Sequence, residues 1–327
     1  MTLVLNRSQL TDLLDTGAVL DTLRSGFAAN PTGITAQRIR TDLPGPGTAT
    51  ALIPGLIDGI PAYTVKVNAK FPAARPALRG VVCLHDLHDG TLLALMDSAS
   101  LTAWRTGLAA ALATHTLARP DATSVAVIGA GAQATMTLQG LRRLRPLGRL
   151  TVCDTDPAKA QAFADRFDGS PQGPGDAGSA GAGRPRVETD AAATAHDADI
   201  VITATWSRRP LLTLGDLRPG AHVTTLGADE PGKIEIGADV LLKARTVVDD
   251  VDLAVAMGAL GNAGLRYDAA NATLAQVLRG EAAGRENEDQ ITVYAPVGLP
   301  WQDLAIAWPT YLAATNHHLG THVDLLA

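Results

Sequence analysis

A glycine-rich turn between an apolar strand and a helix constrains the fold of this chain more than any other feature. Residues 125–134 read VAVIGAGAQA, an apolar run followed by Gly129, Gly131 and the small Ala134. In this pattern the first glycine makes a tight turn and the second lets the backbone approach a pyrophosphate. The small third residue lets the helix pack on the strand. The turn therefore predicts a dinucleotide-binding unit.

Apolar strands and helices alternate after the turn. Strands are expected at 125–129, 150–154, 198–205, 222–228 and 246–250, with helices at 131–144 and 157–167. Strands that are apolar on both faces and alternate with helices are typical of a parallel sheet with helices on both sides. Helical segments at 253–261 and 273–284, a last strand at 290–296 and a helix at 301–317 follow, and the low-complexity stretch 169–186 is expected to be a surface loop.

More than a hundred residues precede the glycine-rich turn, and their pattern differs. Residues 8–29 indicate one or two helices. Residues 38–96 contain short β-rich runs separated by Gly and Pro turns, which favours an antiparallel meander or curved sheet. An alanine-rich helix at 100–120 then leads to the turn.

These patterns predict an α/β protein with a Rossmann-type parallel-sheet domain inserted into an α+β domain. The dinucleotide-binding domain is expected to span residues 120–299. The α+β domain is expected to be formed by residues 1–119 and 300–327, on both sides of the insertion.

Bulk properties narrow the function classes. The 327 residues carry a formal net charge of −6, which gives no electrostatic case for nucleic acid or an anionic membrane as partner. We find no run of about 18 apolar residues and no signal-peptide pattern, so we expect a cytoplasmic protein that does not engage a membrane. The histidines lack metal-ligand spacing, and no metal is expected.

A carboxylate at the end of the second expected strand bears on the choice of cofactor. Asp154 closes the run LTVCD, where it is placed to accept hydrogen bonds from the ribose hydroxyls. A 2′-phosphate would meet its negative charge, so NAD(H) is favoured over NADP(H). Arg184 or Arg186 could instead hold a 2′-phosphate, and Asp154 could instead only cap the next helix.

Several separate motifs resemble one family. They are AYTVKVNAKFP (62–72), WRTGLAAALATHTLARPDATSVAVIGAGAQA (104–134), TLGADEPGKIEI (225–236), LAQVLRGEAAGRENEDQITVY (274–294) and GLPWQDLAIA (298–307). Together they resemble the ornithine cyclodeaminase/mu-crystallin family. The resemblance implies hydride transfer between nicotinamide and the α-carbon of an amino acid or the matching imine. It also implies a homodimer assembled through the meander domain, which would bind the substrate.

The resemblance implies that basic side chains bind the substrate carboxylate. Lys66, in YTVKVN, is implied to be the active-site lysine, although a lysine in an alternating strand can also protect a sheet edge. Arg105 matches the family's arginine in RTG, and a planar guanidinium suits bidentate carboxylate binding. Either Arg38 or Arg40 should match a further carboxylate-binding arginine, and we favour Arg38.

Asp229 is implied to be the catalytic aspartate, which handles protons on the substrate nitrogen. It follows the strand 222–228, and the carboxyl ends of parallel strands face the bound ligand. A turn-forming aspartate is the alternative. Glu230 and Lys233 are expected at the loop surface. Asp303 fits a late family motif, but capping of the final helix explains it equally well.

The expected cofactor contacts gather around the glycine-rich turn and the ends of the neighbouring strands. Thr106, next to Arg105, is expected to reach the cofactor phosphates. The full set of expected cofactor-binding residues is Thr106, Gly129, Gly131, Ala132, Gln133, Asp154, Thr205 and Gly227.

Three departures from the cyclodeaminases bear on the reaction. Ala51 stands where they carry a glutamate, Pro72-Ala73-Ala74 replaces Pro-x-Asn, and Tyr294-Ala295-Pro296 replaces Phe-Asp-Ser. Each loss removes a polar group that would pair with a charged substrate end, and an unpaired buried ammonium is costly.

We therefore favour an NAD(H)-dependent oxidoreductase that acts on the C–N bond of an α-amino acid or cyclic ketimine carboxylate, as an amino-acid dehydrogenase or imine reductase does. An ornithine cyclodeaminase-type lyase and a non-catalytic nucleotide-binding protein like mu-crystallin remain as alternatives.

Overall fold

The computed structural model describes residues 1–29, 35–45, 47–168, 183–325 and 327. Most of the expected loop at 169–186 lies outside the described residues. The chain divides into two compact units, one of Met1–Arg105 with Leu299–Ala327 and one of Thr106–Gly298. Within the described part of the chain, no helix is long and apolar enough to cross a membrane.

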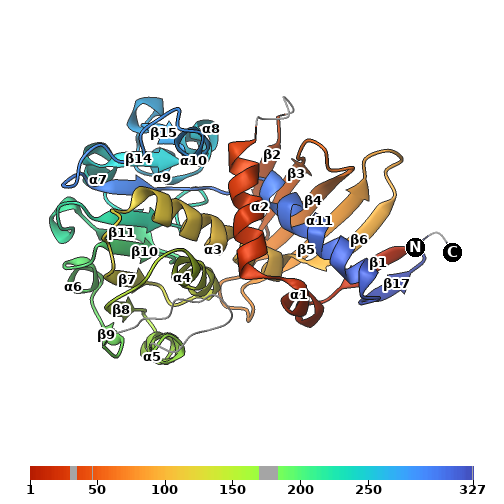
Figure 1. The fold of residues 1–327 in the computed structure, drawn as a ribbon, viewed down its shortest axis with the longest axis horizontal. Helices are drawn as coiled ribbons and strands as arrows, with labels where there is room; N and C mark the ends of the chain where they lie inside the picture. Colours follow the sequence, from red (N-terminus) through yellow and green to blue (C-terminus); the bar gives the residue numbers. More distant parts are fainter. Residues whose placement is uncertain (30–34, 46, 169–182, 326) are drawn as a thin grey trace. The chain divides into compact units, whose positions relative to one another are not determined.

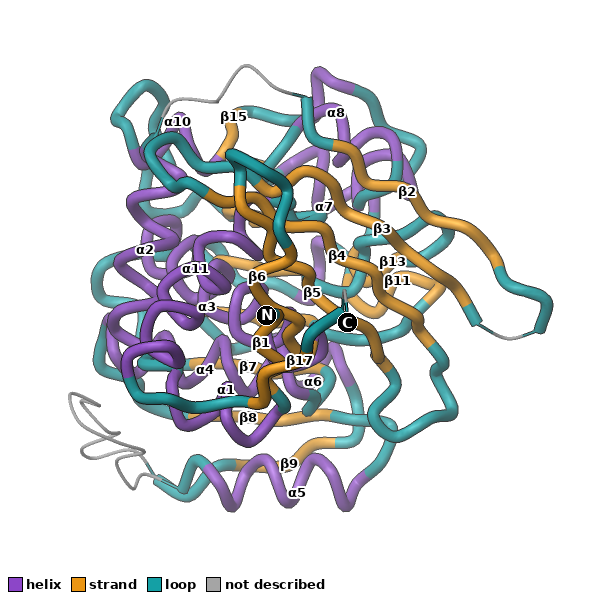
Figure 2. Tube along the Cα trace, turned by 90° about the vertical axis from the view of Figure 1, so that its right-hand side faces the viewer, coloured by secondary structure: helices purple, strands orange, loops and turns teal. Residues whose placement is uncertain are grey.

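A mixed seven-stranded sheet forms the first unit. In spatial order its strands are β17 (Thr321–Val323), β1 (Thr2–Leu5), β6 (Leu92–Asp97), β5 (Leu78–Asp86), β4 (Ala62–Lys70), β3 (Thr48–Gly55) and β2 (Gln37–Asp42). Neighbours from β2 to β6 are antiparallel, which confirms the predicted meander. Strand β1 was not predicted. It pairs with β6 and β17, and both chain ends lie beside these strands in Figure 2.

Helices cover one face of this sheet. They are α1 (Arg7–Leu13), α2 (Thr16–Ala28) and α11 (Trp301–Asn316). The expected segment 8–29 thus forms two helices, begun by the side-chain caps Asn6 and Asp15. Helix α11 packs on β3, β4, β5 and α2, as Figure 1 shows. The Phe27 and Trp301 rings meet edge to face, with centroids 4.9 Å apart.

An eight-stranded parallel sheet forms the second unit. In spatial order its strands are β15 (Ala272–Thr273), β14 (Arg245–Val248), β16 (Thr292–Tyr294), β12 (His222–Thr225), β10 (Ile200–Thr203), β7 (Val125–Ile128), β8 (Leu150–Cys153) and β9 (Arg186–Glu188). All neighbours are parallel, so the predicted α/β class with a Rossmann-like sheet is confirmed. The short edge strands β9 and β15 were not predicted, nor was the small pair β11 (Arg208–Leu212) and β13 (Ile234–Ile236).

The helices of the second unit are α4 (Ala132–Leu144), α5 (Pro157–Arg166), α6 (Ala191–Ala195), α7 (Ala238–Lys243), α8 (Val251–Ala256), α9 (Ala259–Asn262) and α10 (Leu274–Leu278). Helix α3 (Ser98–Leu117) begins in the first unit and continues in the second. The helix expected at 273–284 is shorter than predicted. It ends at Leu278 because Gly280 adopts a φ of +74°, in the left-handed region.

Candidate active site

A buried ion pair lies on the helix-covered face of the first unit's sheet. Side chains of a strand alternate between faces, so Lys66, at the centre of β4, points the same way as the buried Thr64 and Asn68. Its Nζ lies 2.7 Å from both carboxylate oxygens of Asp303. Each of the two side chains is 1% exposed. Burying two charges costs solvation free energy, and only a short, well-aligned contact between them offsets this cost.

Arg105 joins the same cluster from helix α3. It is 5% exposed, and its Nε lies 3.5 Å from Asp303 Oδ1. Its guanidinium also donates to Gln302 Oε1 at 3.1 Å. Asp303 does not cap α11, because Pro300 occupies the N-cap position. The capping alternative for Asp303 was therefore wrong.

The charges of this cluster act on the pKa of Lys66. Burial is the largest cause, and together with the neighbouring Arg105 it lowers that pKa to about 7. Asp303 opposes the shift, and Arg38 adds a smaller effect in the same direction as Arg105. Two basic side chains, Lys66 and Arg105, thus share the carboxylate of Asp303, an arrangement suited to binding a second carboxylate.

Strand register separates the two arginines of β2. Arg38 is the partner of Leu52, which is the partner of Lys66, so Arg38 and Lys66 lie in one row across three strands. Arg40 lies one row further along, and its guanidinium binds Asp42 at 2.6 Å. Both arginines point to the face that carries Lys66, and Arg38 shares its row.

Ala51 lies on the opposite face of the sheet. It is the register partner of Ile39 on β2 and Val67 on β4, and Val67 follows Lys66 directly in the chain. Ala51 therefore does not share the face of Lys66, although the sequence comparison had counted it among the positions where a polar group would pair with the substrate. The sequence pattern could not show this, because it left open how β3 pairs with β4.

The glycine-rich turn opens the second unit's helix α4. Gly129 has a φ of +97°, and a Cβ there would lie 2.5 Å from the carbonyl oxygen of Ala204. A Cβ on Gly131 would meet nothing within 4 Å, so the space beside the second glycine is open. Gly131 is the N-cap of α4 without a side-chain cap, and Ala132 after it is exposed. Open space at an uncapped helix N-terminus fits a pyrophosphate.

Asp154 is held at this turn by the backbone. Its Oδ2 accepts from the N–H of Ala130 at 2.8 Å, and its Oδ1 accepts from the N–H of Asp156 at 2.9 Å. The cap of α5 is Asp156, which binds the N–H of Ala158. The alternative that Asp154 caps the next helix was therefore wrong.

The remaining cofactor candidates come from helices α3 and α4 and from the loops after β10 and β12. Thr205 follows β10 and Gly227 follows β12, and the side chain of Glu235 accepts a hydrogen bond from the backbone of each. Glu235 was not predicted to matter. Gln133 lies half-buried in the first turn of α4, and Thr106 lies half-buried in α3.

Asp229, in the loop after β12, forms part of a compact charged cluster. Lys233 Nζ lies 3.0 Å from Asp229 Oδ1 and 3.5 Å from Glu230 Oε2, and 4.4 Å from the centre of the Trp206 ring. Burial lowers the pKa of Lys233, but the two carboxylates outweigh it and raise the pKa overall. Glu230 and Lys233 are 4% and 7% exposed, so the prediction of a loop surface was wrong for both.

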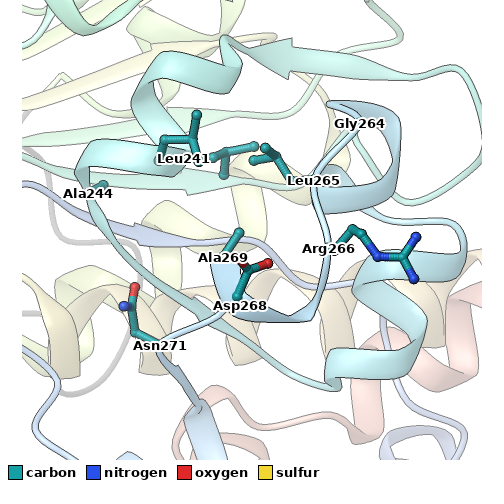
Figure 3. A pocket seen from close by; sticks show the side chains of 9 residues that line it. Leu241, Ala244, Gly264, Leu265, Arg266, Asp268, Ala269 and Asn271 are labelled. Atoms are coloured by element: carbon teal, nitrogen blue, oxygen red, sulfur yellow. The ribbon is translucent and has the colours of Figure 1, made fainter.

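The second unit also has a pocket away from these residues. It has a volume of about 320 Å³ and lies beside α7 and the 264–271 segment. Figure 3 shows Leu241 and Leu265 near each other at its wall, with the Arg266 side chain extending away from them. It contains none of the expected site residues. No cluster of metal-ligating side chains occurs in the ranges that the structure describes.

The parallel sheet with its glycine-rich turn defines the class as a Rossmann-like α/β protein. A family model, that of the ornithine cyclodeaminase/mu-crystallin family, matches residues 2–317. The chain therefore belongs to this family, as its motifs predicted.

Known relatives include dehydrogenases and reductases. The alanine dehydrogenase of Archaeoglobus fulgidus is 30% identical over 257 residues, which cover 76% of this chain and 74% of that protein. The solved structure of an archaeal alanine dehydrogenase dimer with bound NAD has 26% identity and a TM-score of 0.88, covering 99% of both chains.

The Thermococcus litoralis Δ1-pyrroline-2-carboxylate reductase, solved with NADH and L-proline, has 27% identity and a TM-score of 0.87, covering 98% of this chain and 100% of that one. The family thus includes NAD-binding oxidoreductases, and a dimer is seen in a homologous structure.

Proposed function

We propose that this protein is an NAD(H)-dependent oxidoreductase that acts on the C–N bond of an α-amino acid or cyclic ketimine carboxylate. The observation that carries the proposal is the buried cluster in which Lys66 and Arg105 both contact one carboxylate, that of Asp303. A substrate carboxylate would supply the missing negative charge. Two relatives with this fold, an alanine dehydrogenase and a pyrroline-2-carboxylate reductase, have names that match such a substrate.

Each residue has one role in the proposal. Lys66, Arg105 and Arg38 bind the substrate carboxylate, and Arg40 contributes positive charge from the next row. Asp229 exchanges a proton with the substrate nitrogen. Lys233, 3.0 Å away, orients the carboxylate of Asp229. Bound NAD(H) supplies or accepts the hydride at the α-carbon.

The glycine-rich turn and Asp154 support NAD(H) over NADP(H). The carboxylate of Asp154 is anchored by two backbone N–H groups, so it stays beside the turn. A 2′-phosphate placed near the ribose would be repelled by this charge. Arg184 and Arg186, the alternative ligands for a 2′-phosphate, are both exposed.

An ornithine cyclodeaminase-type lyase is the second candidate. Ala51 had counted against it, but the structure turns Ala51 away from Lys66, so that argument no longer applies. The absence of a carboxylate in Tyr294-Ala295-Pro296 still favours redox chemistry without cyclisation.

An exposed apolar row supports a homodimer through the first unit. Ile39, Ala51, Val67 and Val81 are register partners across β2, β3, β4 and β5. Ile39, Val67 and Val81 are 56%, 47% and 41% exposed. Apolar side chains gathered on an exposed sheet face are typical of an interaction surface, and a second copy of this sheet would cover them.

A cofactor assay tests the proposed reaction. When the protein is mixed with NADH and Δ1-pyrroline-2-carboxylate, NADH should be consumed. The absorbance of NADH measures this consumption. Asp229→Asn should lower kcat about 100-fold or more, the scale of general acid–base catalysis. Asp252→Asn, an exposed carboxylate in the first turn of α8, is the control and should keep the wild-type rate. Ammonia release from ornithine without net NADH consumption would favour the lyase instead.

A further inference from the structure

A single buried carboxylate links the ends of two central strands of the parallel sheet. Glu235, in β13, is 1% exposed. Its Oε1 accepts from the N–H and the hydroxyl of Thr205, at 2.6 and 2.8 Å. Its Oε2 accepts from the hydroxyls of Thr203 and Thr225 and from the N–H of Gly227, at 2.7, 2.8 and 2.7 Å. All five donors come from the carboxyl ends of β10 and β12.

Gly227 allows the two strand ends to come this close. A Cβ at this position would lie 2.3 Å from the carbonyl oxygen of Thr205 and 2.5 Å from Glu235 Oε1. Any larger residue would push the two loops apart. Thr203 and Thr225 are register partners, so their hydroxyls reach the same carboxylate oxygen from adjacent strands.

The same contacts continue to the glycine-rich turn. A Cβ on Gly129 would lie 2.5 Å from the carbonyl oxygen of Ala204 and 2.9 Å from Thr205 Cγ2, so the turn rests on the loop that Glu235 holds. On its other side, the turn is bound to Asp154 through the N–H of Ala130. One line of contacts therefore connects the carboxyl ends of β8, β7, β10 and β12, which are neighbours in the sheet.

We propose that Glu235 is a positioning residue for the cofactor site: it holds the Thr205 and Gly227 loops together, and through them supports the glycine-rich turn. The inference rests on the proposed NAD(H) function and assigns a role to a residue outside the expected cofactor contacts. Loops fixed in advance lose less conformational freedom when a ligand binds, which strengthens binding.

Glutamine cannot replace Glu235 in this role. The backbone N–H of Thr205 faces Oε1 and that of Gly227 faces Oε2. A glutamine side chain has one acceptor oxygen and one donor NH₂ group. In either orientation its NH₂ group faces one of the two backbone N–H groups, so at least one loop loses its hydrogen bond.

The proposal is tested by measuring how tightly the full chain binds NADH in the absence of substrate. The fluorescence of NADH reports its binding. Glu235→Gln should raise the Kd for NADH about tenfold or more, because it leaves a buried N–H donor without its hydrogen bond. Asp199→Asn is the matched control. Asp199 is 7% exposed and accepts from the N–H groups of Thr123 and Ser124, beside the start of β7. Its substitution should lower the melting temperature and leave the Kd within about twofold.

The outcomes separate this inference from the proposed function. An unchanged Kd in Glu235→Gln, or equal weakening in both variants, would overturn the role of Glu235 and leave the NAD(H) function standing. A wild-type protein that does not bind NADH would overturn both. If Glu235→Gln fails to fold, Thr225→Val removes one hydroxyl donor and keeps both backbone donors. This substitution should raise the Kd for NADH severalfold, and an unchanged Kd would contradict the positioning role of Glu235.

Discussion

Lys66 and Asp303 are 237 residues apart in the chain, yet their charged atoms lie 2.7 Å apart. Burial lowers the pKa of Lys66 to about 7, and Asp303 is the group that raises it. Whether Lys66 carries a charge near neutral pH therefore depends on a residue at the start of the last long helix. In the proposed function, this charge binds the substrate carboxylate.

The pH dependence of substrate binding should reveal this coupling. A lysine whose pKa lies near 7 loses its proton as the pH rises, so kcat/KM should fall above that pH, by up to about tenfold per pH unit. Asp303→Asn removes the raising influence, so its decline should begin at a lower pH than in the wild type. At pH 7.5 its KM should rise about tenfold, with a smaller effect on kcat.

Lys66→Arg is the control, because a guanidinium stays protonated throughout this range. Its kcat/KM should show no decline that begins near pH 7. Steady-state rates between pH 6 and 9 measure all three proteins. A pH profile of Asp303→Asn that coincides with the wild type would contradict the assigned coupling.

Site residues that stand in a recognisable motif could be predicted from the sequence. Residues whose importance comes from contacts with distant segments were harder to predict. Lys66, Arg105 and Asp229 stand in recognisable motifs, and their roles stay predictions. The sequence left the role of Asp303 open and gave no role to Glu235. Their hydrogen-bond partners come from other segments of the chain, and no local sequence pattern indicates them. The acidic IEI segment after the Asp229 loop was the only available signal for Glu235.

Elements with a strong pattern were predictable, and short or long-range ones were not. The meander and the apolar strands β7, β8, β10, β12 and β14 follow from alternation or from uninterrupted apolar runs. Strands β1, β9 and β15 have four residues or fewer, and their pairing with distant strands determines them. Periodicity also does not show how β3 pairs with β4, so the sequence alone does not reveal which face of the sheet carries Ala51.

The exposed row on the meander makes a prediction at the element scale. If a second copy covers it, Val67→Asp would bury a charge in an apolar interface and should convert the homodimer to a monomer. Leu242→Asp is the matched control, since Leu242 is 61% exposed in α7 of the second unit. Analytical ultracentrifugation measures the masses. A dimeric Val67→Asp, or a monomeric Leu242→Asp, would contradict an interface at this row.

For the whole molecule, the late position of the glycine-rich turn follows from the order of the two units. Residues 1–105 fold mainly with the last segment of the chain, and they contain the lysine and arginines proposed to bind the carboxylate. The second unit contains the glycine-rich turn and Asp229.

The most direct test follows the hydride itself. NADH carrying deuterium at both C4 positions of the nicotinamide would be incubated with the protein and Δ1-pyrroline-2-carboxylate, and the product would be analysed by mass spectrometry and NMR. The proposed function predicts one deuterium at the α-carbon of the amino-acid product for each NADH oxidised. Product formation without deuterium at the α-carbon would contradict it, as would the absence of both NADH oxidation with ketimine carboxylates and NAD+ reduction with α-amino acids.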